Sequence, residues 1–262
     1  MTDPTPLDLA HSAMEAAPDD VSKRLKYFER LADSELFLLL AKEATGESIS
    51  PELFELADAS YVLAFDRDER LAAFVGKPAP YAALSGRVIA GMLAGQGIGI
   101  ALNPEVAPSS NVIDAQAIEW LAETVAAAPK ELDVGISEVL SPNVPETLVA
   151  ALGEKLATAT GLADSAYLVQ VVYENGTKGH MLGVVNALPN AQGAIANAVN
   201  EALTFSGLEA AALDVTFIGP QDAIASALAN VGLRFDLPQP VPTAEYAPKA
   251  PGMDPESPPK LR

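Results

Sequence analysis

Three short apolar runs between Glu35 and Asn103 constrain the fold of this chain more than any other feature. Leu36–Leu40 contains only leucine and phenylalanine, and Tyr61–Phe65 and Ile98–Leu102 are apolar from end to end. Runs of this length are typical of strands, and an apolar residue at every position indicates a strand buried on both faces. The sequence therefore predicts a sheet that is covered by helices.

The residues between the first and second runs, and those just after the second, predict how the sheet is connected. Leu53–Leu56 and the second apolar run are expected to form a hairpin. Asp66 follows this run, and Glu69 comes three residues later. This is the spacing of a capping box, in which an acidic residue reaches back to the helix start, so we expect a helix over Arg67–Val75.

A longer helix is expected over Ala82–Ala94, with Ser85 as the cap near its beginning. Its glycines Gly86 and Gly91 lower the intrinsic stability of a helix by about 1 kcal/mol each relative to alanine. We therefore expect that they allow the helix to approach the sheet closely. Gly95 begins the turn that ends this helix and leads into the third apolar run.

Two helices are expected before the first apolar run. The first covers Leu7–Ala16, and the second begins after Asp20 and places Val21, Leu25 and Leu31 on one apolar face. The rest of the second helix carries the basic residues Lys23, Arg24, Lys26 and Arg30. We interpret this cluster as a solvent-exposed helix face, the usual role of such a charge run.

The second half of the chain predicts a separate set of elements in the order αββαβαβ. Asn175 and Gly176 give a strong hairpin signal, because both residue types accept a positive φ. The expected elements are the helix Glu146–Thr158, the strands Tyr167–Tyr173 and Lys178–Asn186, the helix Asn190–Phe205, the strand Leu213–Ile218, the helix Gln221–Asn230 and the strand Leu233–Phe235. This order suggests a mixed sheet covered by helices.

These patterns predict an α+β fold with two domains, each a mixed β-sheet covered by helices. A helix over Asp114–Ala127 ends the first half, a strand over Leu132–Val139 is expected to bridge the halves, and Ser141–Pro145 is the clearest break in the chain. The predicted boundaries are an N-terminal helical extension at 1–19, a first domain at 20–130, a linker at 131–145, a second domain at 146–236 and a proline-rich, disordered tail at 237–262.

Charge and residue content exclude several classes of function. The formal net charge is −19, and a negative field of this size opposes binding to nucleic acid and to anionic lipid. The chain has no cysteine, and neither His11 nor His180 stands in a metal-ligand spacing. We therefore predict no metal, no cofactor and no catalytic residue. Since no signal peptide or membrane span is recognisable, we expect a cytoplasmic protein.

Two local patterns resemble functional motifs without meeting their requirements. Gly95 and Gly97 close a helix and open a strand, whereas the glycines of a dinucleotide fingerprint follow a strand and open a helix. Asp66, Asp68 and Glu69 offer the oxygen ligands of a magnesium site. The start of a helix explains the same spacing without a metal, so we favour that interpretation.

The carboxyl ends of two predicted strands carry a candidate binding site. Asp66 and Arg67 follow the second apolar run, and Asn103 follows the third. If the two strands are parallel, these residues meet at one edge of the sheet, where ligands bind in open α/β sheets. With Arg70 and Arg87 they form a candidate site for a small anion or a peptide carboxylate. The alternative is a structural Asx turn with ordinary surface arginines.

Several segments of the first half, in a characteristic order and spacing, point to a family. They are Tyr27-Phe28-Glu29, Ser34-Glu35-Leu36-Phe37, the stretch from Tyr61 to Leu71 and the stretch from Gly97 to Pro104. Over about residues 20–126 they resemble the SseB N-terminal domain, from the family named for enhanced serine sensitivity. That family usually has a Thr-Ser pair where this chain has Asp66-Arg67. The segments Tyr167–Gln170, His180–Gly183 and Leu213–Thr216 resemble the SseB C-terminal domain.

The resemblance and the residue content together suggest a function. The SseB family implies no agreed enzymatic activity, and this sequence shows no nucleophile, base or metal constellation. We therefore predict a non-enzymatic interaction or regulatory protein whose partner is another protein. The alternative is a small-molecule sensor, for an amino acid for example, that binds at the strand ends near Asp66 and Asn103.

Overall fold

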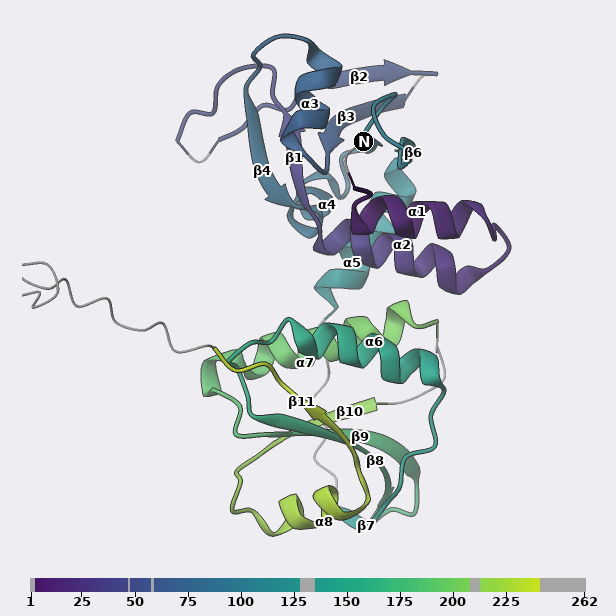
Figure 1. The fold of residues 1–262 in the computed structure, drawn as a ribbon, viewed down its shortest axis with the longest axis vertical. Coiled ribbons are helices and arrows are strands. Elements are labelled where there is room, and N and C mark those ends of the chain that lie inside the picture. Colours follow the sequence, from purple (N-terminus) through teal and green to yellow (C-terminus); the bar gives the residue numbers. More distant parts are fainter. Residues whose placement is uncertain (1–2, 47, 58, 128–134, 208–212, 241–262) are drawn as a thin grey trace, which may run out of the picture.

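The computed structural model describes residues 3–46, 48–57, 59–127, 135–207 and 213–240 and shows two α+β domains (Figure 1). The helices are α1 (Pro6–Glu15), α2 (Val21–Asp33), α3 (Asp68–Val75), α4 (Gly86–Leu93), α5 (Ala115–Ala126), α6 (Glu146–Ala157), α7 (Gln192–Phe205) and α8 (Ala223–Val231), with a 3-10 turn η1 (Pro189–Ala191). The strands are β1 (Glu35–Leu39), β2 (Leu53–Leu56), β3 (Ala59–Phe65), β4 (Tyr81–Ser85), β5 (Ile98–Leu102), β6 (Asn111–Ile113), β7 (Ile136–Leu140), β8 (Ser165–Tyr173), β9 (Lys178–Val185), β10 (Leu213–Ile218) and β11 (Leu233–Asp236). The predicted α+β class with two mixed, helix-covered sheets is confirmed.

The first sheet has the order β4-β1-β3-β5-β6, and β2 lies against β3 beyond the end of β1. β3 and β5 are parallel, as the candidate site requires, and the other pairs are antiparallel. The predicted hairpin of β2 and β3 is confirmed. β1 and β2 therefore share one edge of β3, with Phe37 opposite Phe65 and Leu53 opposite Val62.

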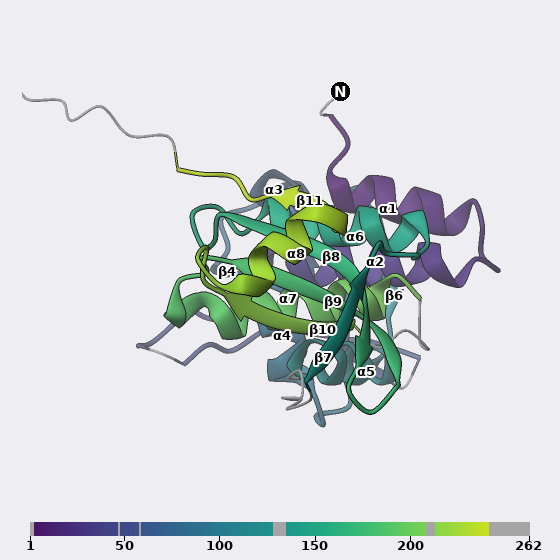
Figure 2. The same cartoon turned by 90° about the horizontal axis from the view of Figure 1, so that it is seen from below.

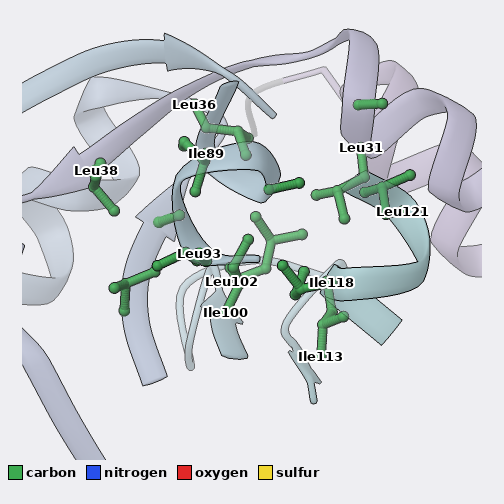
Figure 3. Packing of buried hydrophobic residues seen from close by; sticks show 14 of the residues in the cluster. Leu31, Leu36, Leu38, Ile89, Leu93, Ile100, Leu102, Ile113, Ile118 and Leu121 are labelled. Carbon is green, nitrogen blue, oxygen red and sulfur yellow. The ribbon is translucent and has the colours of Figure 1, made fainter. Parts of the chain in front are cut away.

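The main core of the first domain lies on one face of this sheet. Leu36 and Leu38 of β1 pack there with Ile89 of α4, among helices α1, α2, α4 and α5 (Figure 3). Leu39 points to the opposite face and packs with Leu71 of α3. β1 is thus buried on both faces, as its apolar sequence predicts. Helices α1, α2, α4 and α5 pack on one face, and α3 packs on the other.

The helix predicted over Ala82–Ala94 is wrong in its first turn, because Tyr81–Ser85 form strand β4 along the outer edge of β1. Ala82 and Leu84 pack against the main core, whereas Tyr81 is exposed. Burial therefore alternates with the period of a strand, and pairing with β1 outweighs helix propensity. Ser85 precedes α4, but its side chain makes no capping hydrogen bond.

Gly86 allows a close approach, but towards α2 and not towards the sheet. A Cβ atom at this position would lie 1.8 Å from the backbone oxygen of Leu31. The amide of Gly86 also donates a hydrogen bond to the carbonyl of Ser34 at 2.9 Å. Gly86 therefore allows a close approach of its helix, as expected, but the neighbouring element is α2 and not the sheet.

The second sheet has the order β10-β9-β8-β11, and β7 pairs with β8 beyond the end of β11. β9 and β10 are parallel, and the remaining pairs are antiparallel. Helices α6 and α7 pack on one face and α8 on the other (Figure 2). The predicted order αββαβαβ is confirmed from α6 to β11.

Two of the predicted boundary segments belong to the folded domains. β7 lies inside 131–145, the predicted linker, yet it pairs with β8 and so extends the second sheet instead of bridging the halves. α1 lies inside 1–19, the predicted extension, yet Leu7 is buried in the main core. Most of the tail at 237–262 that was predicted to be disordered, namely residues 241–262, lies outside the described residues. Within the described part of the tail, Leu237 is buried in the second domain.

Ion pairs join the two domains, and they change the role of two residues of the basic cluster. Lys26 and Arg30 of α2 both pair with Glu154 of α6, so the exposed-face interpretation is wrong for them. Lys23 and Arg24 are exposed, as that interpretation expects. Each described helix is either too short or too polar to cross a membrane.

A second group of charges, the interdomain ion cluster, consists of Glu29, Asp33, Arg87, Lys155 and Glu201. Lys155 Nζ donates to Asp33 Oδ2 at 2.6 Å and to Glu201 Oε2 at 3.0 Å, and it lies 3.6 Å from Glu29 Oε1. Burial disfavours the ammonium form of Lys155, but its hydrogen bonds to Asp33 and Glu201 outweigh burial and raise its pKa. The cluster therefore holds α6 and α7 of the second domain against α2 and α4 of the first.

The two glycines of α4 provide a matched test of the packing between α2 and α4. Gly86→Ala is expected to lower the free energy of unfolding by about 2–3 kcal/mol, because its Cβ meets a backbone atom that cannot rotate away. Gly91→Ala meets no atom within 4 Å and is expected to raise stability by up to about 1 kcal/mol. Urea denaturation of both variants measures the difference, and equal effects would show that α2 and α4 do not pack as described.

Candidate functional site

Asn103 joins the carboxyl ends of β3 and β5. Its Oδ1 accepts a hydrogen bond from the amide of Asp66 at 3.1 Å, and its own amide donates to the carbonyl of Ala64 at 2.9 Å. Its Nδ2 donates to Ser109 Oγ at 2.9 Å. Asn103 has a φ of 46°, a conformation that asparagine tolerates better than most residues. The two strand ends therefore converge as the sequence predicts, around a side chain that is fully buried.

Arg70 stands beside this junction and binds two carboxylates. Its Nη1 donates to Asp66 Oδ1 at 2.7 Å and to Asp8 Oδ1 at 3.0 Å, and its Nη2 donates to Asp8 Oδ2. Asp8 therefore receives the two-point contact that a guanidinium offers to a carboxylate ligand. We call Thr5, Asp8, Asp66, Arg70, Asn103 and Ser109 the Arg70 cluster.

Asp8 reaches this position because of the local sequence at the start of α1. Thr5 and Asp8 form a reciprocal capping box: the Asp8 amide donates to Thr5 Oγ1 at 3.0 Å, and the Thr5 amide donates to Asp8 Oδ2 at 2.9 Å. Pro6 opens the helix, and the buried Leu7 fixes α1 to the main core. The three-residue spacing of Thr5 and Asp8 is the sequence signal of this capping box, and the prediction from the sequence missed it.

The surroundings of Asp8 keep it ionised. Burial opposes its charge, but hydrogen bonds from Arg70, Ser109 and the Thr5 amide outweigh burial and hold the pKa of Asp8 well below its usual range. Ser109 Oγ donates to Asp8 Oδ1 at 2.5 Å. The cluster therefore contains two carboxylates, one guanidinium and several neutral donors that satisfy the remaining oxygen atoms.

The capping role predicted for Asp66 is wrong. α3 begins at Asp68 with Arg67 as its N-cap residue, and no side chain caps it. The carboxylate of Asp66 instead accepts hydrogen bonds from Arg70 and from Thr5 Oγ1, the latter at 2.6 Å. Asp68 lies in the first turn, where its charge suits the positive end of the helix.

Three of the five predicted binding residues come together, namely Asp66, Arg70 and Asn103. Arg67 instead donates from Nη2 to the carbonyl of Asp3 at 2.8 Å. Arg87 lies in the interdomain ion cluster, where its Nη1 donates to Glu201 Oε1 at 2.8 Å, because α4 packs on the sheet face opposite to α3. Arg70 is thus paired with carboxylates of the chain itself. Asp8 takes the position beside Arg70 that was predicted for the carboxylate of a ligand.

His180 is not hydrogen-bonded to a nucleophile or a carboxylate within the described residues. His180 lies on β9 opposite Gln170 and Leu213, and its Nε2 has no hydrogen-bond partner among the described residues. The hydrogen bond from Tyr173 to Asp214 is on the other face of that sheet, with the residues packed under α8. The described part of the chain also contains no group of three or more histidine or acidic residues suited to a metal.

The face of the first sheet on which α3 packs has a buried centre and exposed apolar residues around it, and we call it the α3 face. Directly opposite residues in paired strands share a face. Phe54 lies opposite Tyr61, Tyr81 opposite Leu39, and Val112 opposite Ala101, and the second member of each pair packs under or beside α3. Five large apolar residues are exposed on this face: Phe54 (46%), Leu56 (44%), Phe74 (39%), Tyr81 (48%) and Val112 (49%).

These five are among the twelve large hydrophobic residues that are exposed on the described surface, and Tyr81 on β4 and Val112 on β6 lie at opposite edges of the sheet. They remain exposed because α3 is only 8 residues long and covers the sheet near Leu63 and Phe65. The opposite face has four helices packed on it. An apolar face left open in this way is typical of a site where another protein binds.

Comparison of the chain with protein-family models, with curated proteins and with solved structures finds no match. The arguments for function therefore rest on the geometry described above.

The buried pairing of Asp8 gives a test with a defined pH dependence. Asp8→Asn is expected to lower the free energy of unfolding by about 3 kcal/mol at neutral pH, because a neutral amide cannot balance the charge of Arg70. The folded pKa of Asp8 lies below its unfolded value of about 4. The stability that Asp8 contributes is therefore complete above about pH 5 and is lost progressively as pH falls towards the folded pKa, so the difference between wild type and variant shrinks with falling pH.

Asp68→Asn is the matched control, since Asp68 is exposed at the start of α3. Its effect is expected to stay below about 1 kcal/mol. Chemical denaturation at several pH values measures all three proteins. A loss of stability in Asp8→Asn that is no larger than in the control, or that does not change with pH, would contradict the assigned role of Asp8.

Proposed function

We propose that this protein is a non-enzymatic interaction or regulatory protein of the SseB family that binds another protein through the α3 face. The observation that carries the proposal is the presence of five exposed large apolar residues on that face. Burying them against a partner would gain the hydrophobic free energy that the isolated chain leaves unused. The proposal places the protein in the cytoplasm and involves neither nucleic acid nor membrane, in keeping with a net charge of −19.

The Arg70 cluster gives less support to the alternative of an amino-acid sensor. A ligand carboxylate would need the guanidinium donors of Arg70, which Asp8 already occupies. The ligand would also have to displace α1, which Leu7 anchors in the main core. The cluster is explained more simply as the set of hydrogen bonds and ion pairs that holds α1 on the end of the sheet.

Site-specific photo-crosslinking tests the proposal in the intact chain. A benzoylphenylalanine placed at Phe54 or Tyr81 is expected to capture one discrete partner in cells, whereas the same probe at the exposed Leu9 of α1 is not. Phe74→Ser should reduce the yield at Tyr81 by about tenfold or more, since truncation of a central apolar contact often costs that much affinity. Capture of the same proteins at Leu9 as at Tyr81, or no discrete product at either site, would contradict the proposed function.

A further inference from the structure

β2 presents an open edge in the described sheet. Among the described strands β2 pairs with β3 alone, and a bridge to the end of β1 lies before it, between Leu40 and Pro51. On the outer edge of β1, the contact with the β4 segment ends at Leu40, whose amide donates to the carbonyl of Pro80. Figure 1 shows β2 at the end of the first domain that is farthest from the second domain. All four residues of the strand are exposed. An edge of this kind carries backbone N–H and C=O groups that another strand is able to pair with.

The side chains of β2 do not protect this edge. Proteins usually guard an edge strand with charges, proline or a bulge. β2 has one charged residue, Glu55, and its other three residues are Leu53, Phe54 and Leu56. Phe54 and Leu56 point to the α3 face, and Leu53 and Glu55 point to the opposite face. The edge therefore offers backbone pairing together with apolar side chains on both sides.

We propose that β2 accepts an extended segment of a partner protein as an additional strand. The segment carries apolar residues at alternate positions and a lysine or arginine opposite Glu55. This inference rests on the proposed function and specifies how the partner binds. The apolar residues of the added strand lie beside Phe54 and Leu56 and enlarge the α3 face, and backbone pairing supplies the rest of the contact.

The charges near β2 favour a basic segment. Glu52 and Glu55 are both exposed, and the chain as a whole is strongly acidic. Glu55 Oε1 accepts a hydrogen bond from Ser60 Oγ at 2.8 Å, which leaves its other oxygen available to a cation. Opposite charges that face each other across a pair of strands contribute favourably, and the overall field attracts a basic segment before contact.

A second copy of this chain fits the edge poorly. Two copies of β2 that join their sheets through a twofold axis are antiparallel and must pair residues of the same face. Centring the pairing on Glu55 places this glutamate opposite itself. Centring it on Phe54 places Glu55 opposite Leu53 and Glu52 opposite Leu56. Each arrangement brings acids together or sets them against leucine, so we assign the edge to a different protein.

A synthetic peptide of about eight residues, with isoleucine alternating with lysine or threonine, serves as the probe, since strands of this length are common. Two N-methylated isomers of it carry methyl groups on opposite backbone edges, so each isomer lacks the N–H groups of one edge. The isomer methylated on the edge that faces β2 is expected to bind at least about tenfold more weakly than the parent. The other isomer should bind like the parent, and NMR shift changes should centre on Leu53–Leu56.

Charge reversal provides the second measurement. Glu55→Lys should weaken binding of the lysine peptide and strengthen binding of a version with glutamate in place of lysine. Glu35→Lys is the control, because it makes the same change of charge on β1, away from the open edge. Equal binding of both isomers, no binding of the parent peptide, or equal effects of the two variants would overturn strand addition at β2.

These outcomes separate the inference from the proposed function. If the crosslinking at Tyr81 succeeds and the two methylated isomers bind equally, a partner uses the α3 face without adding a strand. If crosslinking shows no discrete partner, the proposed function fails, whatever the peptide does at β2.

Discussion

The pairing of Arg70 with Asp8 and Asp66 is the interaction on which the first domain depends. It lies where β3 and β5 end, which is the place where an open sheet with parallel strands tends to bind ligands. Two buried carboxylates beside one guanidinium would be unfavourable without further donors. Asn103, Ser109 and Thr5 connect the strand ends and the carboxylates through hydrogen bonds, and thereby fix α1 over the sheet end. A position suited to ligand chemistry is thus used for structure.

The contact between the domains determines which surface of the first domain remains exposed. Lys155 lies among the carboxylates of Glu29, Asp33 and Glu201, and Trp120 packs between Phe28 and Phe205 with ring centroids 5.3 Å and 6.2 Å away. These contacts use helices α2, α4 and α5, which cover the main core face of the first sheet. Figure 1 shows α3 and β2 on the side of the first domain away from this contact. The second domain therefore packs against the helices on the main core face, and the α3 face lies away from it.

Sequence reasoning succeeded where one local pattern had one physical explanation. Uniformly apolar runs indicated buried strands, and the parallel pairing of two of them brought Asp66 to Asn103 as expected. It failed where contacts between residues that are distant in the sequence determine the position of a side chain. Asp8 meets Arg70 across 62 positions, and Arg87 meets Glu201 across 114, so no local spacing reveals either pair. Leu84 suits a helix as well as a strand, and only pairing with β1 selects the strand.

The distribution of charge between the interior and the surface makes a strongly acidic chain compatible with an apolar contact. The buried acids described here are matched by Arg70, Arg87 and Lys155, so the excess behind a net charge of −19 lies mainly on the surface. Surface charge acts over about a Debye length and chiefly raises the rate of association with a basic partner. Apolar contact acts at short range and chiefly slows dissociation. In the proposed strand addition both forces act on one partner, because Phe54 and Glu55 are neighbours on the same open edge of β2.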